Sequence, residues 1–245
     1  KATQFFGGTS TVAAKATRVR ARIVAQTINE QMQASDKVFI MGHANEDYDA
    51  IGSAIGMAKL SLSLNKETYI VVSGRNENVN RISEMLASES MKVTGHEEDY
   101  NSIMVEEEEA LKHITPDSLL VLVDHHREIL TASKAVLEAI SKRIIVDHHR
   151  RAEDLIGDTV LLYLEPSSSS TSELLTELVG YFNDRLEITP AEATALYSGI
   201  VLDTKNFAVQ TGERTFEAAA LLRRSGADPN MVRLMFKDDM DVLKL

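Results

Sequence analysis

The sequence predicts an α/β fold: a doubly wound, mainly parallel sheet flanked by helices, with a helical C-terminal part. Short runs of continuously apolar residues, rich in Val, Ile and Leu, recur through the first two thirds of the chain, as in strands buried on both faces. Stretches with helical spacing of apolar residues separate these runs, which is typical of parallel strands joined by helical crossovers. The chain has 245 residues, 44% of them hydrophobic, which supplies enough apolar surface for one large domain or two small ones.

The first half of the chain alternates between the two element types. Helical spacing predicts a helix over residues 12–35, with Arg18, Arg20 and Arg22 on or beside its polar face, as a solvated surface or a docking surface. Apolar runs predict strands at residues 37–41 and 68–73. Between and after them, apolar spacing predicts a helix that begins near Asp49 and another over residues 78–88.

The second half continues with strands and then becomes helical. Apolar runs predict strands at residues 119–123, 143–146 and 159–165. Apolar spacing then predicts helices over residues 171–184, 190–202, 214–225 and 228–236.

Composition excludes several classes of function. Without cysteine, the chain has no disulfide scaffold, no thiolate zinc site and no cysteine nucleophile. A net charge of −11 argues against binding duplex nucleic acid through a broad basic patch. No apolar run is long enough to span a membrane, and no signal peptide is visible. A phosphate substrate would need local positive charge, for which a metal ion is the obvious source.

Clusters of Asp and His, two of them with Arg, follow four of the apolar runs. They comprise His43, Asp47 and Asp49; Asp124, His125, His126 and Arg127; Asp147, His148, His149, Arg150 and Arg151; and Asp203. Because the carboxyl ends of parallel strands share one edge of a sheet, where ligands bind in open α/β folds, we expect these clusters to meet. A single histidine after a strand is usually a hydrogen-bonded core residue, but four such clusters indicate a site.

The residue types in these clusters suit a particular metal chemistry. Carboxylates and imidazoles without sulfur favour Mn²⁺, with Mg²⁺, Co²⁺ and Fe²⁺ as alternatives. The candidate ligands exceed the need of one ion, which favours two ions about 3.5–4 Å apart. Such a pair would hold a phosphoryl group and activate a water as the nucleophile.

The clusters also carry a resemblance. GHANEDYDAIGSAIG at 42–56, VDHHR at 123–127, VDHHRR at 146–151 and VLDTKNF at 201–207 resemble motifs of the DHH superfamily of phosphoesterases. FFGG near the start, RVRAR at 18–22, EPSSSSTSELLTEL at 165–178 and TGERTFEAAALLRRSGAD at 211–228 are similar to the GdpP-type cyclic-di-AMP phosphodiesterases of that superfamily. The resemblance covers nearly the whole chain.

This resemblance implies a role for each matching residue. His43 and Asp47 would hold the first ion, Asp49, His148 and Asp203 would hold the second, and Asp124 would bridge both. His149 would face the substrate phosphate or the attacking water, and Asp147 would orient a histidine. Direct ligation by His125 or His126 stays an alternative to an orienting or surface role.

Further substrate contacts are expected from Arg150, Ser169, Ser170 and Arg214. The serine run enters a helix near Thr171, either as a phosphate-facing loop or as a plain N-cap. Arg214 would meet a phosphate or form an exposed salt bridge. Gln210 stands where the family resemblance leads us to expect a basic residue.

We therefore expect an N-terminal helical lead-in at residues 1–36 and a DHH phosphoesterase domain at residues 37–245. The expected reaction is hydrolysis of cyclic-di-AMP to linear pApA. The alternatives are a nanoRNase or pAp phosphatase acting on short oligonucleotides, and a module that binds metal and nucleotide without turnover. A family II inorganic pyrophosphatase fits the flanking segments less well.

The resemblance also sets expectations about the whole protein. The DHH-associated C-terminal domain, with its GGGH motif, has no counterpart in this sequence. We expect a soluble piece of a membrane-anchored bacterial protein, lying at the cytoplasmic face without membrane contact of its own. A homodimer is one option for its assembly.

Overall fold

The computed structural model describes residues 4–6, 14–90, 99–183 and 186–242, and within them seven strands form one sheet. The strands are β1 (Gln4–Phe6), β2 (Lys37–Met41), β3 (Glu67–Val71), β4 (Met104–Val105), β5 (Leu119–Val123), β6 (Lys142–Asp147) and β7 (Leu161–Leu164). Their order is β1-β7-β6-β5-β2-β3-β4, and every pairing is parallel. The expected parallel sheet is confirmed.

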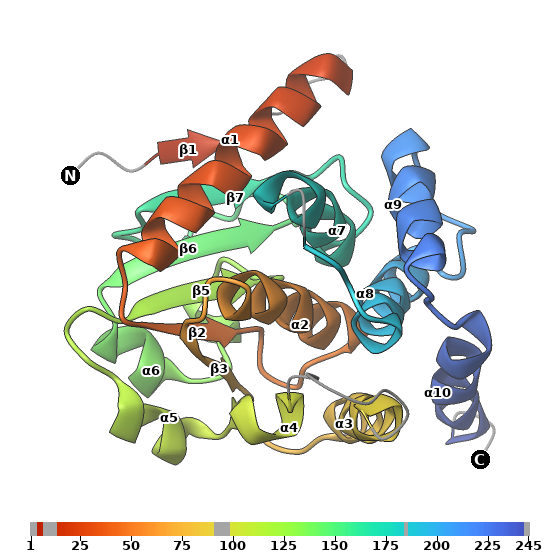
Figure 1. The fold of residues 1–245 in the computed structure, drawn as a ribbon, viewed down its shortest axis with the longest axis horizontal. Helices are drawn as coiled ribbons and strands as arrows, with labels where there is room; N and C mark the ends of the chain where they lie inside the picture. The colour runs from red at the N-terminus through yellow and green to blue at the C-terminus, as the bar shows by residue number, and fades with distance from the viewer. Residues whose placement is uncertain (1–3, 7–13, 91–98, 184–185, 243–245) are drawn as a thin grey trace.

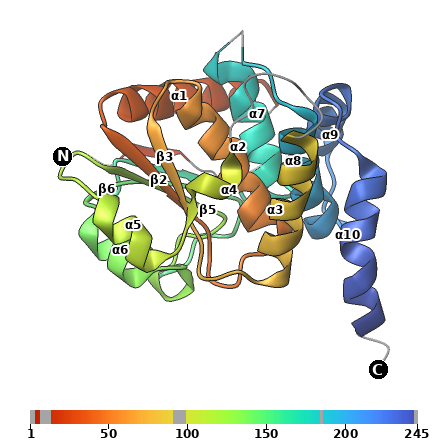
Figure 2. The same cartoon turned by 60° about the horizontal axis from the view of Figure 1, so that its bottom comes forward.

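Helices cover both faces of this sheet. They are α1 (Ala14–Gln33), α2 (Tyr48–Leu62), α3 (Glu77–Ser90), α4 (Tyr100–Ile103), α5 (Glu107–His113), α6 (Lys134–Ala139), α7 (Thr171–Phe182), α8 (Pro190–Asp203), α9 (Glu213–Arg224) and α10 (Pro229–Val242), with a 3₁₀ turn at Glu128–Leu130. Figures 1 and 2 show α1, α2 and α7 on one face and α5 and α6 on the other. The last helices, α8 to α10, continue beyond α7 toward the C-terminus (Figure 1).

Successive strand residues face two separate apolar cores, which explains the continuous apolar runs. In β2, Val38 and Ile40 join the larger core, which is shared with α1, α2, α7 and α8. Phe39 and Met41 point the other way, into a smaller core that includes Val136 and Leu137 of α6. A strand buried on both faces needs apolar residues at every position, so it shows no polar alternation.

The expected strands and helices are all present, with their ends shifted by a few residues. Residues 12, 13 and 184, expected to be helical, and the glycine pair at 7–8 lie outside the described residues. Five short elements were not predicted from the sequence: β1, β4, α4, α5 and α6. These elements span two to seven residues, too few to establish a period.

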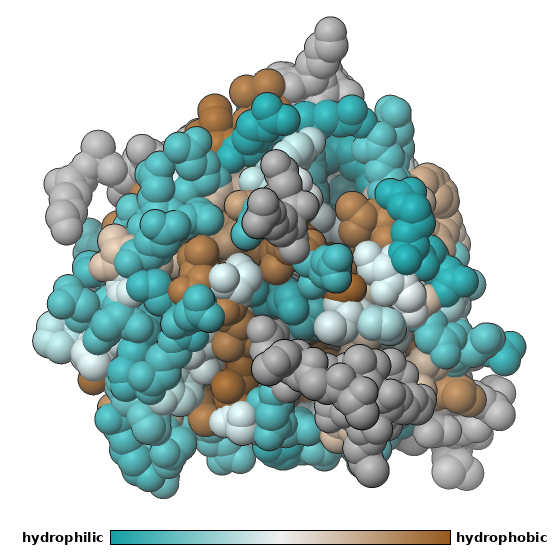
Figure 3. Space-filling view, in the orientation of Figure 1, coloured by the Kyte–Doolittle hydropathy of each residue, from teal (hydrophilic) through white to brown (hydrophobic). Residues whose placement is uncertain are grey.

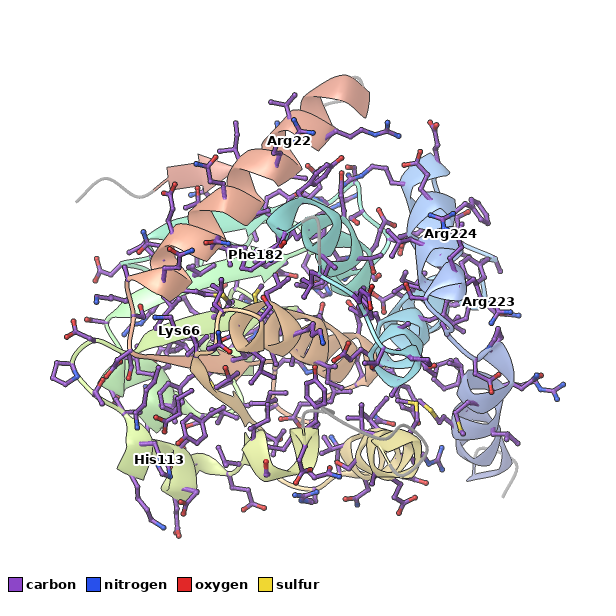
Figure 4. All side chains as sticks on the ribbon, viewed as in Figure 1. Arg22, Lys66, His113, Phe182, Arg223 and Arg224 are labelled. Atoms are coloured by element: carbon purple, nitrogen blue, oxygen red, sulfur yellow. The ribbon has the colours of Figure 1, made fainter. Side chains whose placement is uncertain are left out.

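The arginines of α1 contact the chain itself. Arg18 pairs with Glu217 of α9 at 2.6 Å, and Arg20 pairs with the buried Glu165 at 3.1 Å. Arg22, labelled in Figure 4, lies over the ring of Tyr181 in α7, with 5.4 Å from its guanidinium carbon to the ring centroid. These arginines therefore make contacts within the fold, although Arg18 and Arg22 stay exposed.

The surface in the view of Figure 3 is mostly hydrophilic, with smaller hydrophobic areas between the charged side chains. Among the described residues, no helix combines the length and the apolar character needed to cross a membrane.

The strand order reverses at β2. From β2 the chain moves outward through β3 and β4, and it then returns to β5 on the other side of β2 before continuing to β6 and β7. A reversal of this kind is a topological switch point, and the crevice at the carboxyl ends of the two strands is the usual ligand site of open α/β sheets. His43 follows β2 and Asp124 follows β5, so both lie at this crevice.

Candidate metal centre

Three neighbouring strands deliver most of the expected site residues to one edge of the sheet. His43 follows β2, Asp124 directly follows β5, and Asp147 ends β6, with His148 next. Asp47 is the N-cap of α2, where its Oδ1 accepts hydrogen bonds from the amides of Asp49 and Ala50 at 2.9 Å.

The expectation that all four clusters follow strands is wrong for Asp203. This residue ends helix α8, although its carboxylate still reaches the same crevice. The preceding residues look like a strand because α8 is buried on nearly all sides against α2, α7 and α9, so its sequence lacks a polar face.

Six of these side chains form two groups that share Asp124. In one group, His43 Nε2 lies 3.6 Å from Asp47 Oδ1 and 3.5 Å from Asp124 Oδ2. In the other, His148 Nε2 lies 3.1 Å from Asp203 Oδ2, 3.6 Å from Asp124 Oδ1 and 4.0 Å from Asp49 Oδ2. These groupings are the ones that the family resemblance implies, and metal ligation by them stays a prediction.

Asp124 is held in a conformation that directs its carboxylate between the two groups. Its backbone is left-handed, with φ of 61°, which turns the chain sharply out of β5. Asp is among the few residues that tolerate this region. The Thr171 hydroxyl donates a hydrogen bond of 3.0 Å to Asp124 Oδ1, leaving Oδ2 directed to His43.

Asp49 is anchored by the start of α7. Its two carboxylate oxygens accept the amides of Thr171 at 2.7 Å and Ser172 at 2.8 Å. These amides have no partner within their own helix, and the helix dipole favours a negative charge there. Gly199 of α8 packs so closely that a Cβ at this position would lie 2.5 Å from Asp49 Oδ1.

Burial and neighbouring charges shift the pKa values of the side chains in the site. Burial lowers the pKa of His43, but the carboxylates of Asp124 and Asp47 outweigh it and raise the pKa to about 11. Burial likewise lowers the pKa of His148, but Asp203 and the neighbouring carboxylates raise it to about 10. Burial, together with the charges of Asp124 and Asp203, raises the pKa of Asp49 well above its usual value. The carboxylates of the crevice therefore favour positive charge beside them, from protonated histidines or from a bound cation.

The donor atoms fit a divalent cation. His148 Nε2 is buried and has no well-directed hydrogen-bond partner among the described residues. Carboxylate oxygens and imidazole nitrogens lie around it, a set that suits Mn²⁺ and similar ions. A cation would displace the protons that the histidines otherwise hold.

Asp147 and His149 form a contact beside these groups. Asp147 Oδ1 accepts a hydrogen bond from His149 Nδ1 at 2.8 Å, and Oδ2 contacts His126 Nδ1 at 2.5 Å. Burial raises the pKa of Asp147, but these two hydrogen bonds outweigh it and lower the pKa. His125 is buried apart, with its Nδ1 3.1 Å from the carbonyl of Val123.

A cavity of about 600 Å³ opens beside the cluster. His148, His149, Arg150, Ser168, Asp203 and Gln210 are among its lining residues. Two of the expected substrate contacts, His149 and Arg150, thus lie at the cavity.

The other expected substrate contacts lie elsewhere. Ser169 Oγ donates to Glu173 at 2.6 Å, and Ser170 Oγ caps α7 by accepting the amide of Glu173 at 3.0 Å. Arg214 forms an ion pair with Glu177 and lines a separate cavity of about 230 Å³ between α1, α7 and α9. The structure does not bring Ser169, Ser170 or Arg214 into the cavity beside the cluster, and their role in substrate binding stays a prediction.

Sequence reasoning missed Glu173, the buried acceptor that organises the serine loop. Its carboxylate accepts hydrogen bonds from Ser168, Ser169 and Thr215. The spacing of Ser170 and Glu173, a helix N-cap followed by Glu at the third position, is a capping signal that could have found it.

The chain is similar to known proteins along most of its length. The sequence model of the DHH family, N-terminal domain, matches residues 37–200. The chain is 40% identical over 240 residues to the cyclic-di-AMP phosphodiesterase PdeA of Listeria monocytogenes, covering 97% of this chain and 35% of that protein. It is 41% identical over 237 residues to the cyclic-di-AMP phosphodiesterase GdpP of Geobacillus thermodenitrificans, with the same shares.

A solved structure shares the fold. An exopolyphosphatase-related protein from Bacteroides fragilis superposes with a TM-score of 0.69 at 22% identity, covering 94% of this chain and 62% of that one. The chain spans about a third of the length of the curated phosphodiesterases that it matches. From the match over residues 37–200, the chain belongs to the DHH family and carries the N-terminal domain of that family.

Proposed function

We propose that this chain is the metal-binding part of a phosphodiesterase that hydrolyses cyclic-di-AMP to linear pApA. The observation that carries the proposal is the pair of Asp/His groups that both contact Asp124 beside an open cavity. The two relatives described above, both cyclic-di-AMP phosphodiesterases, favour this substrate.

We assign two Mn²⁺ ions to the centre, with Mg²⁺, Co²⁺ and Fe²⁺ as alternatives. One would be held by His43, Asp47 and Asp124, and the other by Asp49, Asp124, His148 and Asp203. When bound, the two cations would neutralise the phosphodiester charge and lower the pKa of a water to near neutrality, so that it can attack phosphorus.

The residues at the cavity supply the remaining functions. His149 is 56% exposed, and its Nδ1 is engaged by Asp147, which leaves Nε2 to meet a phosphate oxygen or to move a proton. Arg150 places a positive charge at the cavity wall. The attack forms a new P–O bond and breaks one P–O3′ bond, leaving the 5′-phosphate and the 3′-hydroxyl of pApA.

The test is turnover of cyclic-di-AMP with Mn²⁺, with products separated by chromatography. pApA, pAp, short oligonucleotides and pyrophosphate are assayed in parallel, so that preference for one of them would replace the proposed substrate. The Asp124→Ala chain should lose both metal binding and turnover, whereas Asp117→Ala, on the exposed surface, should retain both. Retained turnover without Asp124 would refute the proposed site, and bound metal without any product would indicate a binding module.

We also propose, from the same family resemblance, that the whole protein is membrane-anchored with this part at the cytoplasmic face. A homodimer is the proposed assembly, and light scattering of the purified chain tests it.

A further inference from the structure

A buried chain of three side chains runs behind the two ligand groups. Asp147 is fully buried, and each of its carboxylate oxygens contacts one imidazole. Oδ1 accepts from His149 Nδ1 at 2.8 Å and from the His149 amide at 3.1 Å. Oδ2 lies 2.5 Å from Nδ1 of His126, a residue that is only 2% exposed. His126 thus stands behind Asp147, on the side away from the cavity that His149 lines.

The other ring nitrogen of His126 fixes where its proton lies. His126 Nε2 accepts a hydrogen bond of 2.9 Å from the backbone amide of Ala152. A ring nitrogen that accepts carries no proton, so the proton of the neutral ring is on Nδ1. His126 therefore donates to Asp147 Oδ2, and partners at both ends fix the orientation of its ring.

We propose that His126 is a positioning residue, which holds the Asp147 carboxylate so that His149 keeps its ring directed into the cavity. This inference rests on the proposed function, since it concerns the same site. Without the His126 donor, Asp147 Oδ2 would be a buried carboxylate oxygen without its partner, a costly arrangement that favours rotation of the carboxylate. His149 would then lose the acceptor that fixes its ring orientation and the identity of its protonated nitrogen.

A purely structural role for His126 is the competing explanation. Its Nε2 holds Ala152, and its carbonyl accepts the amide of Ile156 at 2.9 Å, so His126 also supports the segment that follows β6. Two substitutions separate the two contacts. In His126→Asn, the side-chain amide can occupy the position of Nδ1 and donate to Asp147, but it cannot reach Ala152. In His126→Gln, the amide extends to the position of Nε2 and can accept from Ala152, but it leaves Asp147 without its donor.

The neighbouring histidine supplies a matched control. His125 is as buried as His126, but its Nδ1 lies 3.1 Å from the carbonyl of Val123, and no contact with Asp147 is present in the described structure. His125→Asn therefore makes the same chemical change one position away, with the donor to Val123 retained.

The first readout is the tautomer of each histidine, which does not depend on activity. Long-range ¹H–¹⁵N spectra of the full chain, recorded with diamagnetic Mg²⁺, should show His126 protonated on Nδ1 with a downfield, exchange-protected proton. His149 should be a single tautomer in the wild-type, His126→Asn and His125→Asn chains, and should average between tautomers in His126→Gln. A His126 ring protonated on Nε2 would overturn the proposal.

The second readout is turnover of cyclic-di-AMP with Mn²⁺. We expect kcat to fall about 10- to 100-fold in His126→Gln, with KM and the number of bound ions unchanged, and to stay within about threefold in His126→Asn and His125→Asn. Loss of activity in His126→Asn with retention in His126→Gln would show that the Ala152 contact matters instead, and would also overturn the proposal. If the wild-type chain does not turn over cyclic-di-AMP, the proposed function fails, while the tautomer spectra still decide the role of His126.

Discussion

Substitution of Gly199 by Ala tests whether close packing of α8 against α2 and α7 shapes the metal centre. A Cβ at this position would lie 2.3 Å from Ser172 Oγ, 2.5 Å from Asp49 Oδ1 and 2.9 Å from Asp49 Cα. To reach ordinary van der Waals distances, the nearest of these atoms would have to move by about 1 Å. Asp49 Cα is a backbone atom, so a change of rotamer cannot move it away. Overpacking of this kind costs about 1–3 kcal/mol. The better helix propensity of Ala offsets about 1 kcal/mol. We therefore expect the metal-free chain to lose about 1 kcal/mol, and at most about 2 kcal/mol, of its free energy of unfolding.

The same substitution should weaken metal binding, because Asp49 cannot keep both its amide partners and its position. Displacement of a ligand or its support typically costs about 10- to 100-fold in affinity, so one of the two Mn²⁺ sites should weaken by that factor. Urea unfolding in chelator and isothermal titration with Mn²⁺ measure the two effects. Gly180→Ala is the matched control. Its Cβ would meet nothing within 4 Å, so it should leave Mn²⁺ binding unchanged and stabilise α7 by up to about 1 kcal/mol. Wild-type stability and affinity in Gly199→Ala would refute the packing argument.

Three further substitutions probe the surroundings of the site. Glu173→Ala leaves several buried donors without an acceptor, so it should lower the free energy of unfolding, measured in urea, by at least about 3 kcal/mol. Glu153 is exposed, so Glu153→Ala should change this free energy little. Equal stabilities of the two variants would contradict the prediction. His148→Ala should reduce the Mn²⁺ bound per chain from two ions to one, measured by equilibrium dialysis, and His113→Ala should not; two tightly bound ions in His148→Ala would contradict the ligand assignment. Burial lowers the pKa of His125 to about 4 from an ordinary value near 6.5. Between these pH values the unfolded chain binds more protons than the folded chain. The free energy of unfolding should therefore fall by up to about 3 kcal/mol as the pH is lowered from 6.5 to 4. In metal-free chains, His125→Asn should not show this decrease in the free energy of unfolding, which urea unfolding at several pH values measures. Parallel curves of unfolding free energy against pH for the variant and the wild type would contradict the prediction.

The strands were predictable because burial on both faces imposes a strong and simple pattern. In β5 every residue is buried, and the run LLVLV carries that constraint in the sequence. The short α4, α5 and α6 carry too few turns for a period to emerge, so their positions depend on the tertiary packing around them. Asp203 was grouped with residues that follow strands, although a helix was expected over residues 190–202, because the buried end of α8 has the apolar content of a strand.

The residue types of the site were visible in the sequence, but its hydrogen bonds were not. A parallel sheet is expected to gather the residues that follow its strands, so the proximity of His43, Asp124 and His148 follows from the topology. The contact between His126 and Asp147 depends on how two adjacent strand ends are aligned, and the capture of Asp49 by the amides of α7 joins residues more than 120 positions apart. No local pattern specifies such pairings.

The order of the ligands along the chain has a consequence for biosynthesis. Proteins are synthesised from the N-terminus, so the residues of the first group, which ends at Asp124, have all been added when about half of the chain has been synthesised. The second group is incomplete until Asp203 has been synthesised, and Asp49 lacks its two amide partners until Thr171 and Ser172 have been synthesised. A nascent chain can therefore complete the proposed two-ion centre only after α7 and α8 have docked, so that acquisition of the second ion would mark the docking of these two helices.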